Sequence, residues 1–114
     1  MPFVFYAASA FPLRQEANPA MRLLRQVKLG RTGPTLDEQL TLIWNNLRAI
    51  LASAEMTVDN IVRLTSYLRD ASFVEADQSA RLAALGGRAI PTTAIVAQTL
   101  HEDWLVEIEV IAAA

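Results

Sequence analysis

The sequence predicts a two-layer α+β domain in which two helices cover one face of a mixed β-sheet of four or five strands. Two stretches, 36–54 and 73–83, repeat apolar residues at the three- and four-residue spacing of amphipathic helices. Other stretches, above all 104–111, alternate residue by residue as strands do. The predicted order is β-β-α-β-α-β-β, and one domain is expected over residues 1–114 because a chain of this length forms a single core.

The first third of the chain predicts two strands. Residues 2–12 are rich in aromatic and small side chains and end at a proline, which is typical of a buried strand. Residues 14–20 are polar and contain an Asn-Pro pair, so they are expected to form a loop. A second strand is predicted at 21–29, and the glycines and proline that follow it end the strand.

A long helix is predicted next. Thr35 and Glu38 have the spacing of a capping box, in which each side chain satisfies a free backbone N–H of the first turn. The apolar residues that follow form one stripe on the predicted helix: Leu36, Leu40, Ile43, Leu47, Ile50, Leu51 and Ala54. This face should pack against the sheet.

A strand and a second helix follow a short polar link at 56–60. Residues 61–68 are β-branched and alternate, which predicts the strand. Ser72 and Glu75 repeat the capping-box spacing and predict the helix start, while the Gly86-Gly87 pair predicts its end. The helix has an alanine-rich apolar face that contains Phe73, Ala76, Ala80 and Ala83.

The chain is predicted to end in a β-hairpin, with strands at 92–99 and 104–111 and a turn at 100–103. Alternation puts Glu107 and Glu109 on one face of the last strand, between Leu105 and Ile111. Because apolar residues flank the two acids, we expect this face to be half covered, as at a subunit boundary or a cleft. A carboxylate in such a place is able to do chemistry.

The composition indicates an oligomer. Of the 114 residues 53% are hydrophobic and only 19% are charged, which is more apolar than a small monomer requires. Two helices on one side of the sheet also leave the other side uncovered. Both observations predict that identical subunits bury this face in a closed ring.

Composition also excludes several classes of protein and site. A net charge of −2 without a basic cluster argues against nucleic-acid binding. Charged residues interrupt every apolar run and the N-terminus lacks a signal-peptide pattern, so we expect no membrane span and a cytoplasmic protein. The chain has no cysteine, and His101 is its only histidine, so we expect no metal and no cofactor.

Three segments then show a family resemblance. NLRAILASAEM at 46–56, DNIVRLTSYLRD at 59–70 and VEIEVIA at 106–112 resemble the successive hallmarks of the YjgF/RidA family. The resemblance implies a bacillus-chorismate-mutase-like fold and a homotrimer whose sheets face inward, with small-molecule clefts between neighbouring subunits. It also implies hydrolysis of a reactive enamine or imine to a keto acid and ammonia.

The sequence departs from the family pattern in two places. An arginine near the start of the penultimate strand clamps the substrate carboxylate in deaminating members, and counting back from Glu107 without a gap places Thr92 there. The chain also starts just before the first core strand, so the family's preceding N-terminal strand is absent or lies outside this sequence. The chain therefore resembles the branches of the family that lack the arginine.

The candidate site residues follow from these comparisons. Glu107 matches the family's acidic residue, which orients the attacking water; the alternative is a structural carboxylate at a subunit seam. Thr92 and Thr93 are candidates for binding the substrate; the alternative is that they only favour the β-strand conformation. Arg88 is a candidate for binding the substrate carboxylate in place of the missing arginine; the alternative is a solvated loop residue. Tyr6 is a candidate for lining the cleft or a core aromatic.

Two functions from different classes remain open. The first is a Rid-like hydrolase in which Glu107 holds the water, acting on a small reactive metabolite. The second is a homotrimer that binds a small metabolite without turning it over, because Thr92 replaces the arginine. The endoribonuclease activity ascribed to some family members finds no support in the charge pattern.

Overall fold

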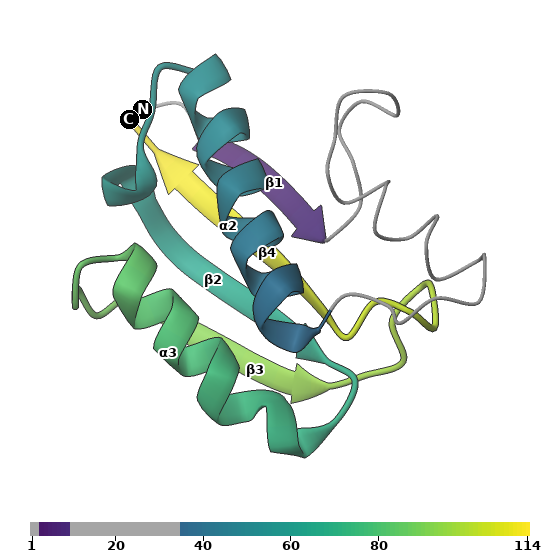
Figure 1. The fold of residues 1–114 in the computed structure, drawn as a ribbon. Coiled ribbons are helices and arrows are strands. Elements are labelled where there is room, and N and C mark those ends of the chain that lie inside the picture. The colour runs from purple at the N-terminus through teal and green to yellow at the C-terminus, as the bar shows by residue number, and fades with distance from the viewer. Residues whose placement is uncertain (1–2, 10–34) are drawn as a thin grey trace.

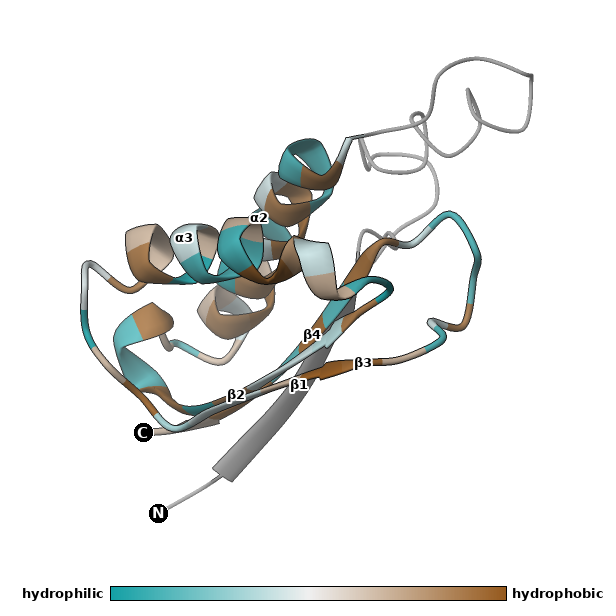
Figure 2. Ribbon diagram, turned by 90° about the horizontal axis from the view of Figure 1, so that it is seen from below, coloured by the Kyte–Doolittle hydropathy of each residue, from teal (hydrophilic) through white to brown (hydrophobic). Residues whose placement is uncertain are grey.

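The computed structural model describes residues 3–9 and 35–114, and these form a four-stranded sheet with two α-helices on one side (Figures 1 and 2). The elements in chain order are strand β1 (Phe3–Ser9), helix α2 (Leu36–Ser53), strand β2 (Ile61–Leu68), helix α3 (Val74–Ala84), strand β3 (Thr92–Val96) and strand β4 (Val106–Ala113). Short 3-10 helices precede β2 (Val58–Asn60) and α3 (Ala71–Phe73). The predicted α+β class is confirmed. The strand predicted at 21–29 and the loop at 14–20 lie outside the described residues.

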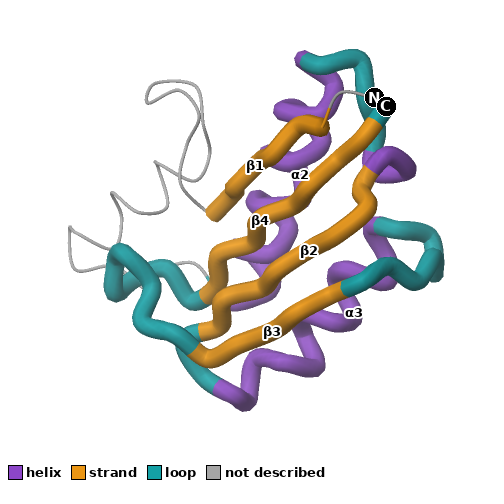
Figure 3. Tube along the Cα trace, turned by 180° about the vertical axis from the view of Figure 1, so that it is seen from behind, coloured by secondary structure: helices purple, strands orange, loops and turns teal. Residues whose placement is uncertain are grey.

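The strand order is β1-β4-β2-β3, as Figure 3 shows from the side opposite the helices. Strand β4 pairs antiparallel with β1 and with β2, whereas β2 and β3 run parallel. The prediction of a terminal hairpin is therefore wrong, because β2 lies between β3 and β4. Parallel strands need a crossover connection, and α3 provides it between β2 and β3.

Helix α2 begins where the sequence predicts. The Thr35 hydroxyl oxygen accepts the Glu38 backbone N–H (3.2 Å) and donates to the Glu38 carboxylate (3.2 Å), so the two side chains bond to each other at the N-cap. The start of α3 differs from the prediction. Asp70, not Ser72, provides the cap there: its carboxylate accepts the Ser72 backbone N–H (2.8 Å) and starts the 3-10 turn that leads into α3. The predicted helix end is confirmed, with φ of +62° at Gly86 and +80° at Gly87.

The core lies between α2 and the sheet. Strand β4 buries every second residue, so its apolar side chains contact the helices while Glu107 and Glu109 lie on the other face. The buried apolar residues of the sheet are Ile61, Leu64, Leu68, Val106, Ile108, Val110 and Ala112, and those of α2 are Leu40, Ile43, Trp44, Leu47 and Leu51. Within the described part of the chain, no element covers the face that carries the two glutamates (Figure 3).

A buried polar pair connects α3 to the sheet. Asp77 of α3 is 1% exposed, and its carboxylate accepts a hydrogen bond from the Ser66 hydroxyl of β2 (3.1 Å). Burial raises the pKa of Asp77 above its usual range, although the bond from Ser66 and the charge of Arg81, 3.6 Å away, oppose the shift. Because the native state favours the protonated acid, the stability that Asp77 contributes is lost as pH rises through its folded pKa.

Asp77→Asn should therefore become more stable relative to the unmodified protein as pH rises from about 4 to 7, because the amide still accepts from Ser66 but carries no buried charge. Thermal unfolding of both proteins across this range measures the difference. Asp77→Ala is the control, since it leaves a buried hydroxyl without its acceptor and should cost about 1–3 kcal/mol. A difference between Asp77→Asn and the unmodified protein that stays constant with pH would contradict this account.

Candidate functional site

The candidate site is built on the uncovered face of the sheet. Antiparallel pairing places Tyr67 of β2 opposite Glu107 of β4, and Thr65 opposite Glu109. Residues opposite each other share a face, so these side chains form a polar row across the middle of the sheet. All four are half-buried in the single chain.

Glu107 is a half-buried carboxylate on the uncovered face of the sheet. Partial burial raises the pKa of Glu107, and the nearby backbone N–H of Leu100 opposes that shift. Leu100 belongs to the loop between β3 and β4, so the loop folds back over the strand that carries the acid. A half-buried carboxylate with a raised pKa is a candidate for a catalytic base.

Glu109 is bound by Tyr67. The Tyr67 hydroxyl donates to the Glu109 carboxylate at 2.9 Å. This bond, followed by burial and by the charges of Glu109 and Glu107, raises the pKa of the Tyr67 phenol. Glu109 therefore holds an aromatic hydroxyl beside Glu107.

The two threonines of β3 lie on opposite faces. Thr93 pairs with Thr65 on the uncovered face, and its hydroxyl oxygen accepts a hydrogen bond from Arg63 Nη2 at 2.8 Å. Thr92 pairs with the buried Leu64 on the helix side, and its hydroxyl donates to the Ile90 carbonyl at 3.0 Å. Thr93 therefore shares a face with the glutamates, whereas Thr92 does not.

Two other predicted residues are placed away from Glu107. The Arg88 guanidinium donates to the carbonyl oxygens of Val58 (2.8 Å) and Ile61 (3.2 Å), at the end of β2 far from Tyr67. Because each strand residue advances about 3.3 Å, this end of the sheet lies roughly 20 Å from the Tyr67–Glu107 pair. Arg88 thus anchors the start of β2. Tyr6 stands opposite Val110 in the pairing of β1 with β4.

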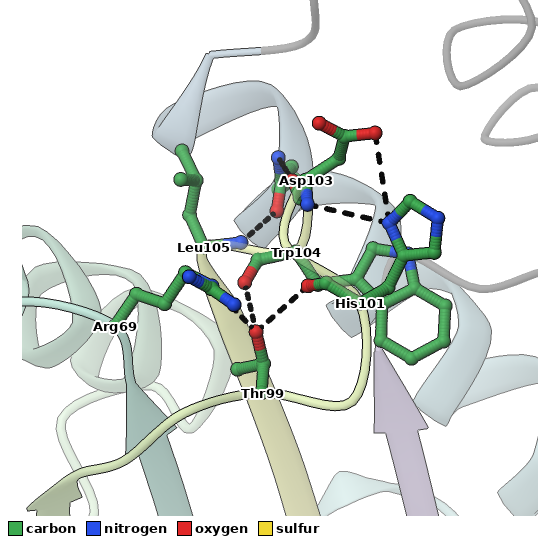
Figure 4. Close-up of polar contacts among 7 residues, drawn as sticks. Arg69, Thr99, His101, Asp103, Trp104 and Leu105 are labelled. Atoms are coloured by element: carbon green, nitrogen blue, oxygen red, sulfur yellow. Dashed lines mark hydrogen bonds and ion pairs between the residues drawn. The ribbon is translucent and has the colours of Figure 1, made fainter. Parts of the chain in front are cut away.

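A network of hydrogen bonds holds the loop between β3 and β4 (Figure 4). Thr99 is only 5% exposed; its hydroxyl oxygen accepts from Arg69 Nε at 2.8 Å and donates to the carbonyl oxygens of Trp104 (2.7 Å) and His101 (2.9 Å), which share the proton. His101 also lies against the Trp104 ring, with 5.4 Å between centroids, and its Nδ1 accepts the Asp103 backbone N–H at 3.3 Å.

Gln39 binds the same loop from α2. This side chain is 1% exposed; its amide nitrogen donates to the Asp103 carbonyl (2.9 Å) and its oxygen accepts the Leu105 N–H (2.9 Å). The Arg69 backbone N–H donates to the Leu105 carbonyl at 3.0 Å. The loop is therefore bound both to the first turn of α2 and to the end of β2.

Sequence reasoning missed Arg63, Thr99 and Leu100 as parts of this site. The alternation of residues 61–68 already puts Arg63 and Tyr67 on one face, opposite Leu64 and Leu68. The sequence did not show which strand pairs with β4. Thr99 carries no sequence signal, because its role depends on the path of the loop.

A groove on the helix side of the molecule contains none of the candidate site residues. A groove of about 610 Å³ lies between α2 and α3, so it is on the helix side and away from Glu107. Its walls combine alanines of α3 with polar side chains and the edge of Trp44: Asp37, Leu40, Thr41, Trp44, Asn45, Arg48, Ala76, Ser79, Ala80, Ala83 and Ala84. Neither Glu107 nor Tyr67 lines it, so we place the candidate site on the uncovered face.

Residues 3–9 and 35–114 contain neither a cluster of metal-binding side chains nor a helix that could span a membrane. In this part of the chain no three histidine, cysteine or acidic residues stand close enough together to hold a metal ion. None of the helices in the same part is long and apolar enough to cross a membrane.

Comparisons with known proteins agree with the fold. The family model described as Endoribonuclease L-PSP matches residues 22–114. A protein of unknown function from Pseudomonas aeruginosa superimposes with a TM-score of 0.76 at 19% identity, over 94% of this chain and 70% of the other. RidA from an Antarctic Psychrobacter superimposes with a TM-score of 0.67 at 21% identity, over 76% of this chain and 71% of the other.

A third structure, YyfA of Yersinia pestis, is described as a protein of unknown function of the conserved Rid family. It superimposes with a TM-score of 0.67 at 25% identity, over 74% of this chain and 68% of the other. No curated protein sequence matches this chain. The structural neighbours carry the chorismate-mutase-like fold, and this chain has it too.

Proposed function

Because this chain belongs to the endoribonuclease L-PSP family, which includes the YjgF/RidA proteins, we propose that it is a Rid-like hydrolase of small imines or enamines. The observation that carries the proposal is Glu107, a half-buried carboxylate with a raised pKa on the uncovered face of the sheet. Three copies of the chain would cover this face and form clefts between neighbouring subunits. Each cleft would hold one substrate molecule.

The proposed reaction needs only a base and a water molecule. Glu107 takes a proton from water as the water oxygen bonds to the imine carbon, and the C=N bond becomes a C–N single bond. That proton then passes to the nitrogen and gives a carbinolamine. Glu107 next takes the proton of the new hydroxyl group and passes it to the nitrogen as the C=O bond forms and the C–N bond breaks, so the products are a carbonyl compound and ammonia. The imine is already electrophilic, so orienting the water is most of what the protein contributes.

The polar row favours a substrate without a carboxylate. On the Glu107 face the Thr93 hydroxyl is neutral, and the guanidinium next to it, that of Arg63, already donates to Thr93. Arg88 is bound to backbone carbonyls at the far end of β2. A neutral hydroxyl does not replace charge-assisted bonds to a carboxylate, so simple 2-imino acids should be poor substrates.

RNA cleavage, the activity that the family name suggests, fits the charges of this protein less well. The uncovered face places Glu107 and Glu109 side by side, and the chain has a net charge of −2. Phosphate backbones are bound mainly by clustered lysines and arginines. The charge pattern therefore favours a small neutral or cationic substrate.

Glu107→Gln should reduce imine hydrolysis by about 10²- to 10⁴-fold, because the amide keeps the shape of the side chain but accepts no proton. Semicarbazide trapping of residual imine measures the rate. Glu109→Gln is the matched control on the same face and should retain most activity. Equal activity of the unmodified protein and Glu107→Gln on a hydrolysed substrate would remove Glu107 from the mechanism. Ligand binding without turnover would support the alternative of a metabolite-binding trimer.

Thr93→Arg should improve clearance of 2-imino acids by about tenfold or more, since one charge-assisted bond contributes roughly 1.5–3 kcal/mol. The new guanidinium would lie on the Glu107 face, and Arg63 would lose its Thr93 acceptor in the variant. Thr92→Arg is the control, because position 92 pairs with Leu64 on the helix side. Improvement by Thr92→Arg alone would show that the pairing of β3 has been assigned to the wrong face.

A further inference from the structure

Arg69 is a half-buried cation at the end of β2. Its backbone N–H donates to the Leu105 carbonyl at 3.0 Å, so Arg69 continues the pairing of β2 with β4 one step past Leu68 and Val106. Residues that pair across two strands share a face, which puts Arg69 on the uncovered face together with Leu105 and Glu107. Arg69 therefore lies two residues beyond the level of Glu107, roughly 7 Å along the sheet.

A buried hydroxyl orients the Arg69 guanidinium (Figure 4). Thr99 is 5% exposed, and its hydroxyl oxygen accepts a hydrogen bond from Arg69 Nε at 2.8 Å. The proton of the same hydroxyl is already donated to the carbonyl oxygens of Trp104 and His101, so toward Arg69 the hydroxyl acts only as an acceptor. The loop between β3 and β4 thus sets the direction of the guanidinium.

The two terminal nitrogens of Arg69 remain available to a ligand. Among the described residues, no hydrogen bond uses Nη1 or Nη2, and no carboxylate forms an ion pair with this guanidinium. A guanidinium that is bound only through Nε presents its two Nη groups side by side, which is an arrangement that binds both oxygens of a carboxylate. Because an unpaired charge that is partly removed from water is costly, a bound anion would stabilise Arg69.

We propose that Arg69 binds a carboxylate group of the substrate that lies several bonds from the imine carbon. This inference rests on the proposed function in one respect, because it places the imine carbon at Glu107. Thr99 holds the guanidinium two residues along the sheet from Glu107, so one small molecule spans both groups. The substrate class is then an imine or enamine with a distal carboxylate, which has no net charge when the imine nitrogen is protonated.

The place of Arg69 differs from the place where a 2-imino acid needs a cation. Such a substrate carries its carboxylate on the imine carbon itself, so the group that binds it has to lie close to Glu107. On the β3 side of the uncovered face stands the neutral Thr93, which pairs with Thr65. Arg69 lies in the opposite direction along β2 and is bound to Thr99. Poor turnover of 2-imino acids and binding of a distal carboxylate are therefore compatible.

Amino acids with the amine at the far end of the chain test the inference without imine chemistry, because their ammonium group replaces the protonated imine nitrogen. In calorimetric titrations of the full chain, 5-aminopentanoate should bind more tightly than 2-aminopropanoate, whose carboxylate is too near, and than pentylamine, which has none. Arg69→Gln should weaken binding of 5-aminopentanoate about tenfold or more, since charge-assisted bonds are lost, and should affect pentylamine much less. Arg48→Gln removes a guanidinium from the exposed side of α2 and is the matched control.

Thr99 provides a second test, as the residue that positions Arg69. Thr99→Val removes the hydroxyl but keeps the shape of the side chain, so the guanidinium loses its fixed direction. The preference for 5-aminopentanoate over shorter and longer members of the series should then flatten, and Thr99→Ser should restore it. A merely structural role of Thr99 would weaken the binding of all members equally.

The outcomes separate this inference from the proposed function. The inference is overturned if no member of the series binds, if 5-aminopentanoate and pentylamine bind equally well, or if folded Arg69→Gln keeps the preference. A preference that depends on Arg69, in a protein that hydrolyses no imine, would leave the carboxylate site standing and reject the proposed function. Hydrolysis of imines without any preference for a distal carboxylate would do the reverse.

Discussion

Double pairing of β4 is the constraint on which the rest of the structure depends. Because β1 and β2 bond to its two edges, the side chains of β4 have only two directions, toward the helices or toward the uncovered face. Val106, Ile108, Val110 and Ala112 are at most 1% exposed and form the floor of the core beneath α2. Burial of about 25 cal/mol per Å² of apolar surface fixes this register, since a slip by one residue would bury the two glutamates. The position of the candidate base is thus a consequence of the core.

Local patterns predicted the elements well. Helix α2 and its Thr35 cap, strand β2 over Ile61–Leu68 and the glycine stop after α3 all depend on residues close in sequence. The cap of α3 was assigned to Ser72 because the Ser-x-x-Glu spacing is also a valid signal. In the structure an Asp70 cap and a 3-10 turn come first, and α3 starts one turn later at Val74. Spacing alone does not distinguish these two starts.

The pairing of the strands and the residues that surround Glu107 were less predictable from the sequence. Strands β3 and β4 are neighbours in the sequence, and consecutive strands usually pair, so a hairpin was the natural expectation. The parallel pairing of β3 with β2 changes the site, because it places Thr93 rather than Thr92 on the face of Glu107. Alternation placed Glu107 and Glu109 on one face, and the family resemblance singled out Glu107. The loop between β3 and β4 is held by hydrogen bonds from Thr99 and from Gln39, which lies 66 residues before its partner Leu105, and neither bond has a local signature in the sequence.

We propose that copies of the chain cover the glutamate face of the sheet and so create the cleft. Light scattering across micromolar concentrations tests it most directly. The account predicts a mass three times the 12.5 kDa of one chain. It also predicts that Ile111→Glu, which adds a third acid to the uncovered face without touching the core, lowers that mass to the monomer value. A monomer mass for the unmodified protein would contradict the account, because Glu107 would then face open solvent.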